Sequence, residues 1–442
     1  MPLQYSITGT TSSEIAASVE SGVRSGALEP GTALPPVRTL ASALVLSPGT
    51  IAAAYRTLRQ RGIVETDGRH GTHVRAKPPI SPRSRSRLPI PPGARDLASG
   101  NPDPALLPTL GPRLRRLAPA PVLYGMAGPI PELGVLARER LASDGVPADA
   151  LTVTSGCLDA VERVLGAHLR LGDSVAVEDP GWSNLLDLLA AMDHPVIPVP
   201  VDDDGPDPGQ VEAAIRRGAR ALVVTSRAQN PWGANVSAAR AIQLRAILAG
   251  HPDMLVVEDD HAAELATEPL HSLAGTTRHW AMVRSVSKPL GPDLRCAILA
   301  GDDETVGRVE GRQWLAARWV STVLQALVVE LWRDPAVEEL VTRAGSRYDE
   351  RRTALVAALD RRGVRAHGRS GLNVWVPVED ETAVCARLLE EGWVVAPGRM
   401  YRVASGPGIR LTTSTLAVGH DVDSAADAVA RALAPGSTPA TV

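Results

Sequence analysis

Two stretches of sequence decide the fold of most of the chain. They are MLVVEDDHAAEL, residues 254–265, and SVSKPLGPDLRCAIL, residues 285–299. Each holds a run of four apolar residues next to a cluster of charged or hydroxyl side chains. Such short runs are typical of strands buried in a parallel sheet, whose ligands bind beyond the carboxyl ends of the strands. We therefore predict a mostly parallel α/β sheet with a ligand site among these polar residues.

The same pattern recurs along the chain from residue 96. Strand-like runs at residues 151–153, 174–177 and 221–224 alternate with helical stretches. The first run precedes a small-residue turn into a helix, and backbone N–H groups at a helix start suit a phosphate. The second precedes Trp182, an indole on which a flat ring can stack, and the third precedes the amide of Asn230. Together these clusters suit an aromatic aldehyde that carries a ring nitrogen and a phosphate.

Lysine is scarce, which draws attention to Lys288. Of 46 basic residues only Lys77 and Lys288 are lysines, and arginine cannot replace lysine in imine chemistry because its pKa is too high. Asp259 offers a carboxylate that can keep a ring nitrogen protonated. A lysine amine, an acid and phosphate donors are what pyridoxal 5′-phosphate requires. Each residue also has an ordinary alternative role at a surface, a helix end or in the core, so the prediction depends on their combination.

The N-terminal segment differs in charge from the rest. Residues 1–95 carry twelve basic and five acidic side chains, a net charge of +7, whereas the remainder carries −10. A small basic module on an acidic body suggests a polyanionic partner for that module. Residues 78–94, PPISPRSRSRLPIPPGA, are rich in proline, serine and arginine, as linkers are.

The basic module has the pattern of a winged helix. We predict a helix over residues 12–26, capped by Ser12 or Ser13, and a short helix through Leu40 and Leu44. A third helix follows a turn in which Ser47 serves as the cap. Two short strands, residues 63–66 and 72–75, then flank a basic turn and form the wing. In such modules the second helix of the helix–turn–helix pair enters the major groove of DNA.

Residues 34–74, LPPVRTLASALVLSPGTIAAAYRTLRQRGIVETDGRHGTHV, resemble the GntR-type winged helix. The resemblance implies that Arg38, Ser47 and the start of the third helix contact DNA. Thr50 and Arg56 lie on the free face of that helix, and Arg69 at the wing tip would reach the backbone or the minor groove. The family usually has polar residues where this chain has Pro48 and Gly49, a departure that concerns base readout more than phosphate contact. A winged helix used for protein contacts is the alternative.

The large domain resembles the fold type I, aspartate-aminotransferase-like domain, and its fusion to a GntR winged helix resembles the MocR family of bacterial regulators. The motifs that carry the resemblance are YGMAG, TSGCLDAVERVL, VEDPGW, AQNPWG, VEDDHAAEL and SVSKPLGPDLR. The resemblance implies a mostly parallel central sheet, a smaller α+β subdomain and pyridoxal 5′-phosphate as cofactor. It also implies a homodimer, because the resembled domain builds its sites at a dimer interface.

The resemblance further implies a role for each site residue. Lys288 would form the internal aldimine, Asp259 would pair with the ring nitrogen, and Trp182 would stack on the ring. Asn230 would bind the phenolic oxygen, and Arg410, in GIRLTT, would take the carboxylate of the effector. The predicted phosphate ligands are Ser155, Gly156, Ser285, Arg295 and, toward the partner subunit's site, Tyr124. His261 stands where the family commonly has tyrosine, a departure that bears on transamination more than on cofactor binding.

Our preferred hypothesis is a transcriptional regulator that senses an amino compound through aldimine exchange at Lys288 and binds a double-stranded DNA operator. The alternatives are an active aminotransferase with a vestigial winged helix, and a regulator whose enzyme-like domain only dimerises. We expect no net turnover, with a residual transaminase half-reaction left open. The predicted domains are 1–77 (winged helix), 78–94 (linker), 95–435 (effector domain) and 436–442 (flexible tail).

Composition excludes several other classes of protein. No apolar run approaches the ~20 residues of a membrane helix, and the N-terminus lacks the pattern of a signal peptide. Cys157, Cys296 and Cys385 fit neither a disulfide framework nor a metal site, so we expect three reduced thiols in a cytoplasmic protein. The chain has no phenylalanine, so leucine, valine and alanine must build the core.

Overall fold

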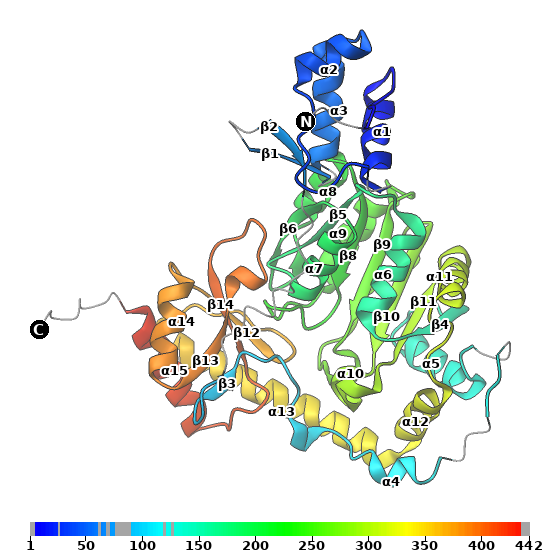
Figure 1. Cartoon of the computed structure of the whole chain (residues 1–442). Helices are drawn as coiled ribbons and strands as arrows, with labels where there is room; N and C mark the ends of the chain where they lie inside the picture. Colours follow the sequence, from blue (N-terminus) through cyan, green and yellow to red (C-terminus); the bar gives the residue numbers. More distant parts are fainter. Residues whose placement is uncertain are drawn as a thin grey trace, which may run out of the picture. The chain divides into compact units, whose positions relative to one another are not determined.

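The computed structural model describes residues 5–24, 27–60, 63–67, 71–75, 90–117, 121–124 and 128–434 (Figure 1). The chain divides into two compact units, and the boundary between them lies near residue 82. Two short segments, residues 170–173 and 189–195, are exceptions to this boundary. The predicted linker is described only from residue 90, and the predicted tail lies outside the described residues. Among the described residues, no helix has the length and apolar character to cross a membrane.

The N-terminal unit is the predicted winged helix. Three helices precede a two-stranded antiparallel hairpin, and Ala33 adds a single bridge to His73. The helices bury one apolar cluster, which includes Ile15, Ile51 and Leu58. The elements are α1 (Ser12–Arg24), α2 (Val37–Leu44), α3 (Pro48–Gln60), β1 (Val64–Asp67) and β2 (Gly71–Val74).

The cap of α1 differs from the prediction. The helix begins at Ser12, and its first turn is closed by Thr11, whose Oγ1 accepts a hydrogen bond from Glu14 N at 3.2 Å. Glu14 Oε2 in turn accepts hydrogen bonds from the backbone N–H groups of Thr10 and Thr11. This reciprocal arrangement is a capping box, and it needs the glutamate three residues after the cap. Ser12 and Ser13 were therefore the wrong choice, whereas Ser47 caps α3 as predicted, accepting from Thr50 N at 3.1 Å.

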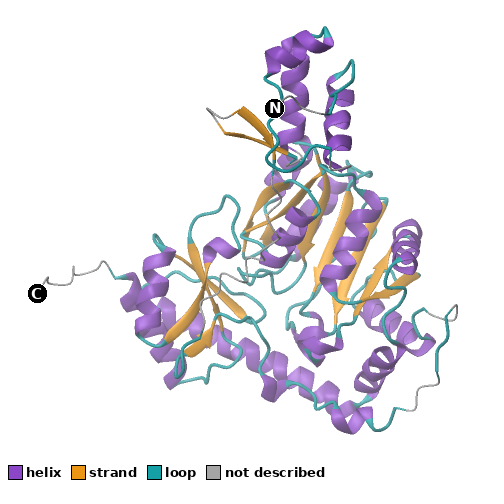
Figure 2. Ribbon diagram, viewed as in Figure 1, coloured by secondary structure: helices purple, strands orange, loops and turns teal. Residues whose placement is uncertain are grey.

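The second unit is built on a mixed, mostly parallel eight-stranded sheet in the order β4-β11-β10-β9-β8-β5-β6-β7 (Figure 2). Strands β10, β9, β8, β5 and β6 are mutually parallel, whereas β11 runs antiparallel to both of its neighbours. The strands are β4 (Ala150–Thr154), β5 (Ser174–Asp179), β6 (Val196–Asp202), β7 (Gly205–Pro206), β8 (Ala219–Thr225), β9 (Leu255–Asp260), β10 (His279–Ser285) and β11 (Ala297–Gly301).

Helices flank this sheet and bury its apolar residues (Figure 1). Polar caps start several of them, as at Asp207 of α8 and Ser237 of α9. The helices are α4 (Gly111–Leu114), α5 (Pro131–Ser143), α6 (Cys157–His168), α7 (Ser183–Ala191), α8 (Pro208–Arg216), α9 (Ala238–Ala249), α10 (Ser287–Leu290), α11 (Asp303–Leu315) and α12 (Thr322–Arg333), with 3-10 turns η2 (Pro104–Leu106), η3 (Ala263–Leu265) and η4 (Pro292–Leu294).

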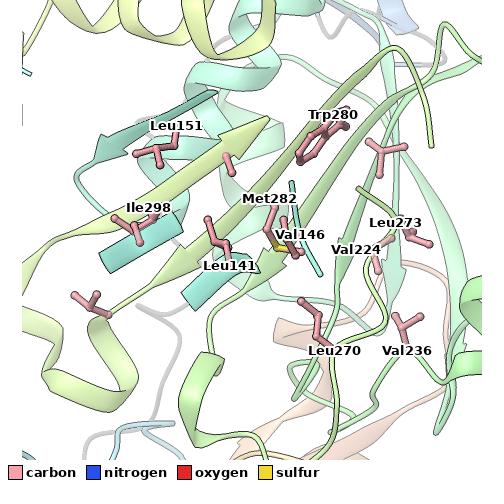
Figure 3. Close-up of a cluster of buried hydrophobic side chains, with 14 of the residues drawn as sticks. Leu141, Val146, Leu151, Val224, Val236, Leu270, Leu273, Trp280, Met282 and Ile298 are labelled. Atoms are coloured by element: carbon pink, nitrogen blue, oxygen red, sulfur yellow. The ribbon is translucent and has the colours of Figure 1, made fainter. Parts of the chain in front are cut away.

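The main core contains leucine, valine and alanine with a few larger side chains, as the absence of phenylalanine requires. Trp280 and Met282 of β10 lie among side chains from neighbouring strands and from the segments that cross the sheet (Figure 3). Leu141 and Val146 pack there from the α5 region, and Val224 from β8 (Figure 3). The strands are buried on both faces, which explains why they read as continuous apolar runs.

The smaller subdomain predicted for the effector domain is also present. Its four-stranded sheet has the order β12-β14-β13-β3, and the long helix α13 (Pro335–Asp360) connects it to the larger sheet (Figure 1). β3 (Arg95–Leu97) lies parallel to β13 (Trp393–Pro397), so the first described strand after the linker belongs to this sheet. The other elements are β12 (Asn373–Pro377), α14 (Glu381–Glu390), η5 (Gly398–Met400), β14 (Gly408–Thr412) and α15 (His420–Leu433).

One carboxylate ties the two sheets together. Asp179, at the end of β5, accepts hydrogen bonds from the backbone N–H groups of Val403, Ala404 and Ser405 and from the Ser405 hydroxyl, at 2.7–2.9 Å. Gly181 N donates to Tyr401 O at 2.7 Å, and a Cβ at Gly181 would lie 2.2 Å from a backbone oxygen. The loop of residues 401–405 is therefore pinned to the large sheet.

Candidate functional site

Eight of the predicted site residues line one cavity of about 360 Å³. It lies at the carboxyl edge of the parallel strands and is closed on the other side by residues of the small subdomain, among them Asn373. The convergence follows from topology, because the carboxyl ends of parallel strands meet at one edge of a sheet. The eight residues are Trp182, Asn230, Asp259, His261, Ser285, Lys288, Arg295 and Arg410.

Lys288 is held at the first turn of α10, directly after β10. Its Nζ donates a hydrogen bond to the backbone carbonyl of Gly100 at 2.6 Å. Ser285 Oγ accepts a hydrogen bond from Ser287 N at 3.1 Å, which shapes the turn that carries the lysine. The amine therefore projects into the cavity from a rigid turn rather than from a surface loop.

Asp259 presents a buried oxygen without a partner. The side chain is nearly fully buried, and its Oδ1 has no hydrogen-bond partner among the residues that the structure describes. Its Oδ2 lies 3.5 Å from His261 Nδ1. A buried carboxylate oxygen without a donor is costly, which indicates that a ligand atom supplies the donor. His261 is only partly exposed and lines the same cavity, so it is not turned to bulk solvent.

The start of α6 and Arg295 form a tight cluster beside the lysine. Gly156 has a φ of +105°, and a Cβ there would lie 2.8 Å from the Arg295 guanidinium. Arg295 Nη2 donates to the Ser155 carbonyl at 2.6 Å, while Ser155 N donates to Asp159 at 2.8 Å. Ser155 and Gly156 are thus next to the cavity without lining it, since Cys157 and Leu158 take that place.

Arg410 lies inside the subdomain interface instead of at a strand-end surface. It is 2% exposed, and its Nη1 donates to Asn230 Oδ1 at 3.1 Å. Its Nη2 donates to the Ala98 carbonyl at 2.5 Å, and its guanidinium lies 4.9 Å over the Tyr401 ring. A buried guanidinium with its face on an aromatic ring and its edge toward a cavity suits a carboxylate.

Cys157 was treated as an ordinary thiol at the sequence level, yet it lines the cavity. Burial and the neighbouring carboxylate of Asp259 raise its pKa well above the ordinary value, so the thiol is neutral. The backbone segment of Ser99, Gly100 and Asn101 and the side chain of Tyr348 were also missed. No residue type at these positions indicates a ligand site, although Cys157 directly follows the predicted Gly156.

Two predictions about strand ends need correction. Strands β5 and β9 continue through Glu178-Asp179 and Glu258-Asp259-Asp260 instead of ending at Val177 and Val257. The polar residues are therefore in the strands, and alternation sends Asp259 and Asp260 to opposite faces. The runs were ended too early because charged residues are rare within buried strands.

The face of the sheet opposite the cavity buries further charges. Asp260 is 0% exposed and binds Arg227 at 2.8 and 2.9 Å and Arg284 at 2.9 Å. Burial alone would raise the pKa of Asp260, but the two guanidinium groups outweigh it and hold the pKa below its ordinary value. Glu178 lacks such partners, and burial raises its pKa to about 8.

Tyr124 does not belong to the cavity of its own chain. Its side chain is 81% exposed, packs edge-on against Trp319 at 5.9 Å and lies under the Arg318 guanidinium. Leu123, the residue before Tyr124, is 66% exposed, and Leu315 at the end of α11 is 89% exposed. The predicted reach of Tyr124 into a partner subunit's site stays a prediction.

The predicted DNA-contacting residues lie on the outside of the winged helix. Arg38, Ser47 and Arg56 are exposed, and Thr50 is half-buried. Ser47 Oγ and Thr50 Oγ1 are 2.9 Å apart, so the two hydroxyls share one hydrogen bond at the start of α3. Arg69 at the predicted wing tip lies outside the described residues.

Comparison with known proteins assigns both units. The profile of the family described as "Bacterial regulatory proteins, gntR family" matches residues 11–74, and that of "Aminotransferase class I and II" matches residues 137–428. The vitamin B6 salvage pathway transcriptional repressor PtsJ of Salmonella typhimurium is 40% identical over 93% of this chain and 96% of its own length. The chain belongs to the MocR family of GntR-type transcriptional regulators.

Other relatives agree with this family. The probable rhizopine catabolism regulatory protein MocR of Rhizobium meliloti is 23% identical, covering 88% of this chain and 83% of its own. The crystal structure of LysN, an α-aminoadipate aminotransferase from Thermus thermophilus complexed with N-(5′-phosphopyridoxyl)-L-leucine, superposes with a TM-score of 0.68 at 24% identity, covering 80% of this chain and 94% of LysN. The fold of the MocR effector domain is thus that of the aminotransferases, and family membership implies a pyridoxal phosphate cofactor. The relatives named as regulators favour regulation over a plain enzyme with a vestigial winged helix.

Proposed function

We propose that this MocR-family protein holds pyridoxal 5′-phosphate at Lys288, senses an amino compound in the same cavity, and changes its binding to an operator DNA in response. The observation that supports this most directly is the pairing of two groups across one cavity. One is the Lys288 amine, and the other is the buried, unpartnered Oδ1 of Asp259. A coenzyme with an aldehyde and a protonated ring nitrogen satisfies both.

The residues present fit the coenzyme. A ring N–H would give Asp259 Oδ1 the donor that the described residues do not supply. Trp182 offers a flat face, and the Arg295 guanidinium beside the start of α6 suits the phosphate together with Ser285. The φ of +105° at Gly156 is a backbone conformation that other residues rarely adopt, which explains the glycine at that position.

When bound, pyridoxal 5′-phosphate supplies an aldehyde that condenses with primary amines. Residues of this chain supply the groups that bind the coenzyme and the amino compound. Lys288 presents its amine from a rigid turn, Asp259 keeps the ring nitrogen protonated, and Asn230 binds the phenolic oxygen. We propose that Arg410, whose two Nη groups donate to Asn230 Oδ1 and to the Ala98 carbonyl, takes the carboxylate of an amino compound in exchange for these bonds. We further propose that the chain acts as a homodimer in which Tyr124 reaches the partner subunit's phosphate site.

The winged helix is the part of the protein that we propose binds the operator DNA. The exposed side chains of Arg38, Ser47 and Arg56, with the half-buried Thr50, suit the DNA backbone and the major groove. Identity of 40% with PtsJ over nearly the whole chain makes vitamin B6 supply the first process to test.

The first experiment is an absorbance spectrum of the purified protein with added pyridoxal 5′-phosphate, followed by titration with amino acids. We expect an absorption band above about 400 nm that shifts but persists on titration, as imines of the coenzyme absorb there. Lys288→Ala should lack this band while keeping its circular dichroism spectrum. Complete conversion to the pyridoxamine form with release of an oxo acid would instead favour an aminotransferase, and absence of any band would overturn the cofactor assignment.

The proposed binding of the winged helix to DNA is tested by measuring how its DNA affinity depends on salt concentration. A bound site is first selected from a random-sequence duplex library, and affinity is measured by fluorescence anisotropy at several salt concentrations. Arg56→Ala should reduce the slope of log K against log salt by about 1, because one phosphate contact is lost. Arg278→Ala, which removes an exposed arginine of the effector domain, is the matched control. An unchanged slope in Arg56→Ala would remove this residue from the interface.

A further inference from the structure

Asn373 is a cavity residue that the proposed coenzyme site does not use. It is the first residue of β12, it is 8% exposed, and it lines the cavity. The residues that we assign to the coenzyme, Lys288, Asp259 and Asn230 among them, belong to the large sheet or to segments that follow its strands. Asn373 belongs to the small sheet, so it contributes to the opposite wall of the cavity.

The side-chain amide of Asn373 is held in one orientation. Its Oδ1 accepts a hydrogen bond from Thr412 Oγ1 at 3.1 Å, and the two residues lie directly opposite each other in the β12–β14 pair. Nδ2 is the other polar atom of the side chain. It has no hydrogen bond within the part of the chain that the structure describes, and it is open to the cavity. Because Nδ2 carries two N–H groups, the cavity wall offers hydrogen-bond donors at this point.

The backbone around Asn373 is fixed as well. The Leu372 carbonyl accepts from Thr413 N and Thr413 Oγ1 at 2.8 and 3.1 Å. The Asn373 carbonyl packs against Gly233 and Gly368, where a Cβ on either glycine would lie 3.1 Å from it. The donors of Nδ2 therefore stay at one place on the wall. A ligand that covers them without accepting a hydrogen bond removes their water and replaces it with nothing, which weakens binding.

Asn373 and Arg410 project from the same face of the small sheet. In the register of β12 with β14, Asn373 lies opposite Thr412, and Trp375 lies opposite Arg410. Alternate residues of a strand share a face, so Asn373 is a diagonal neighbour of Arg410, and such neighbours are about 7–8 Å apart. Because we assign Arg410 to the amino compound, the group that meets Asn373 is part of that compound and not of the coenzyme.

We propose that Asn373 makes this regulator selective for amino compounds whose side chain carries an acceptor oxygen, in a hydroxyl, carbonyl or amide group. The proposal rests on the proposed function, because it concerns the ligand of the same cavity. It adds the chemical class of that ligand. Aliphatic compounds of the same shape are rejected, because they leave the buried donors of Nδ2 unpaired, and sites built to bind a polar group discriminate strongly against analogues that lack it.

The test uses pairs of stable conjugates that differ in their side-chain polar groups. N-(5′-phosphopyridoxyl)-L-asparagine and N-(5′-phosphopyridoxyl)-L-leucine share the ring, the phosphate and the carboxylate, and their side chains have nearly the same shape. The conjugates of L-threonine and L-valine form a second pair. Isothermal titration calorimetry measures their binding to the full-length protein without coenzyme. We expect the oxygen-bearing member of at least one pair to bind about tenfold or more tightly than its partner.

Asn373→Asp keeps the shape of the side chain and the bond from Thr412 but removes both donors. It should bring the affinities within each pair to within about twofold, or reverse their order, because a carboxylate repels an acceptor oxygen. The ratio within a pair cancels any effect of the new charge on the shared ring, phosphate and carboxylate. Asn373→Ala serves the same comparison if the aspartate variant does not fold.

Asn184→Asp is the matched control, because it places the same new charge in the same cavity, on α7 instead of the small sheet. It should leave the ratio within each pair unchanged. A preference that persists in Asn373→Asp would overturn the proposal, as would a wild-type preference for the conjugate of L-2,4-diaminobutyrate over that of asparagine, since the amide would then present its oxygen to the cavity.

Failure of the proposed function gives a different result. If the wild type binds none of the conjugates, the coenzyme site itself is wrong, and the Asn373 proposal falls with it. If it binds both members of each pair with equal affinity, the Asn373 proposal fails and the proposed function survives.

Discussion

Two adjacent aspartates of β9, Asp259 and Asp260, have opposite surroundings although both are buried. Asp260 binds two guanidinium groups on one face of the sheet, whereas Asp259 lines the cavity on the other face with an oxygen that has no partner in the part of the chain that the structure describes. The strand geometry alone produces the difference, since neighbouring side chains point to opposite faces. Within β9, we assign the aspartate that binds two arginines to stabilisation of the fold and the one that lines the cavity to ligand binding.

The largest effect is expected from removing the saturated charge. Asp260→Ala leaves the buried Arg227 and Arg284 with Asp144, which is less buried, as their remaining shared carboxylate, and should lower the free energy of unfolding by about 3 kcal/mol. Urea denaturation followed by circular dichroism measures this. Asp253→Ala, which breaks an exposed ion pair with Arg278, should cost less than about 1 kcal/mol. If Asp260→Ala does not fold, Asp260→Asn gives a milder version; a loss no larger than that of Asp253→Ala would show that the buried network does not stabilise the fold.

Glu178 extends the comparison to a buried carboxyl group that stays protonated. Burial raises its pKa in the folded protein to about 8, above the ordinary value of 4.5, so the folded protein binds a proton that the unfolded chain releases. The stabilisation is complete below pH 4.5 and is lost as the pH rises through 8, with a slope of at most about 1.4 kcal/mol per pH unit.

Glu178→Gln removes this titration while keeping the shape of the side chain. Urea midpoints measured between about pH 5 and pH 8 should fall with pH in the wild type and fall less in the variant. Equal slopes in the two proteins would mean that Glu178 is ionised in the fold.

Glu258 shows how a buried carboxyl group is satisfied by neutral donors. It accepts hydrogen bonds from the hydroxyls of Ser226 and Ser272 at 2.8 and 2.6 Å and from Leu273 N at 2.8 Å. Ser272→Ala should cost about 1–2 kcal/mol of unfolding free energy, less than the loss of Asp260 because the other two donors remain. Ser143→Ala, whose hydroxyl makes an exposed bond to a backbone carbonyl, is the control and should be neutral in the same assay.

The smallest effect on stability is expected at Asp259 itself. Asp259→Asn removes a charge whose Oδ1 has no partner among the described residues, and should change the unfolding free energy by less than about 1 kcal/mol. The same variant should bind pyridoxal 5′-phosphate at least about tenfold more weakly, as measured by equilibrium titration of the absorption band. A large loss of stability with unchanged coenzyme affinity would reverse the roles that we assign to the two aspartates.

Much of this site could be predicted because side-chain type carries the signal. The lysine stands out by its rarity, and Asp259, Asn230 and Trp182 follow apolar runs whose ends must meet in a parallel sheet. Arg410 came from resemblance alone, and its burial between the subdomains was visible only in the structure. The winged helix was predictable nearly to the residue because turn and cap residues mark its boundaries.

The rest could not be read from residue type. The carbonyls of Ala98 and Gly100 bind the two key cations, but every residue has a carbonyl. The role of Asp260 depends on knowing that β9 continues past Val257, since a strand's faces are assigned only once its length is known. Tyr348 lies within a long helix, where nothing in its neighbourhood distinguishes a cavity residue from a core residue.

The binding of the 401–405 loop by Asp179 has a mechanical consequence. Five hydrogen bonds, four to Asp179 and one between Gly181 and Tyr401, act at one point between the large sheet and the small subdomain. A shift of the loop away from Asp179 would break all five together. A second set of contacts joins the same two parts elsewhere, because Gly233 O accepts from Arg369 N and Ser370 N, and Asp204 binds the Arg369 guanidinium. Two separate attachments resist turning of the subdomain as well as sliding, which a single attachment would not do.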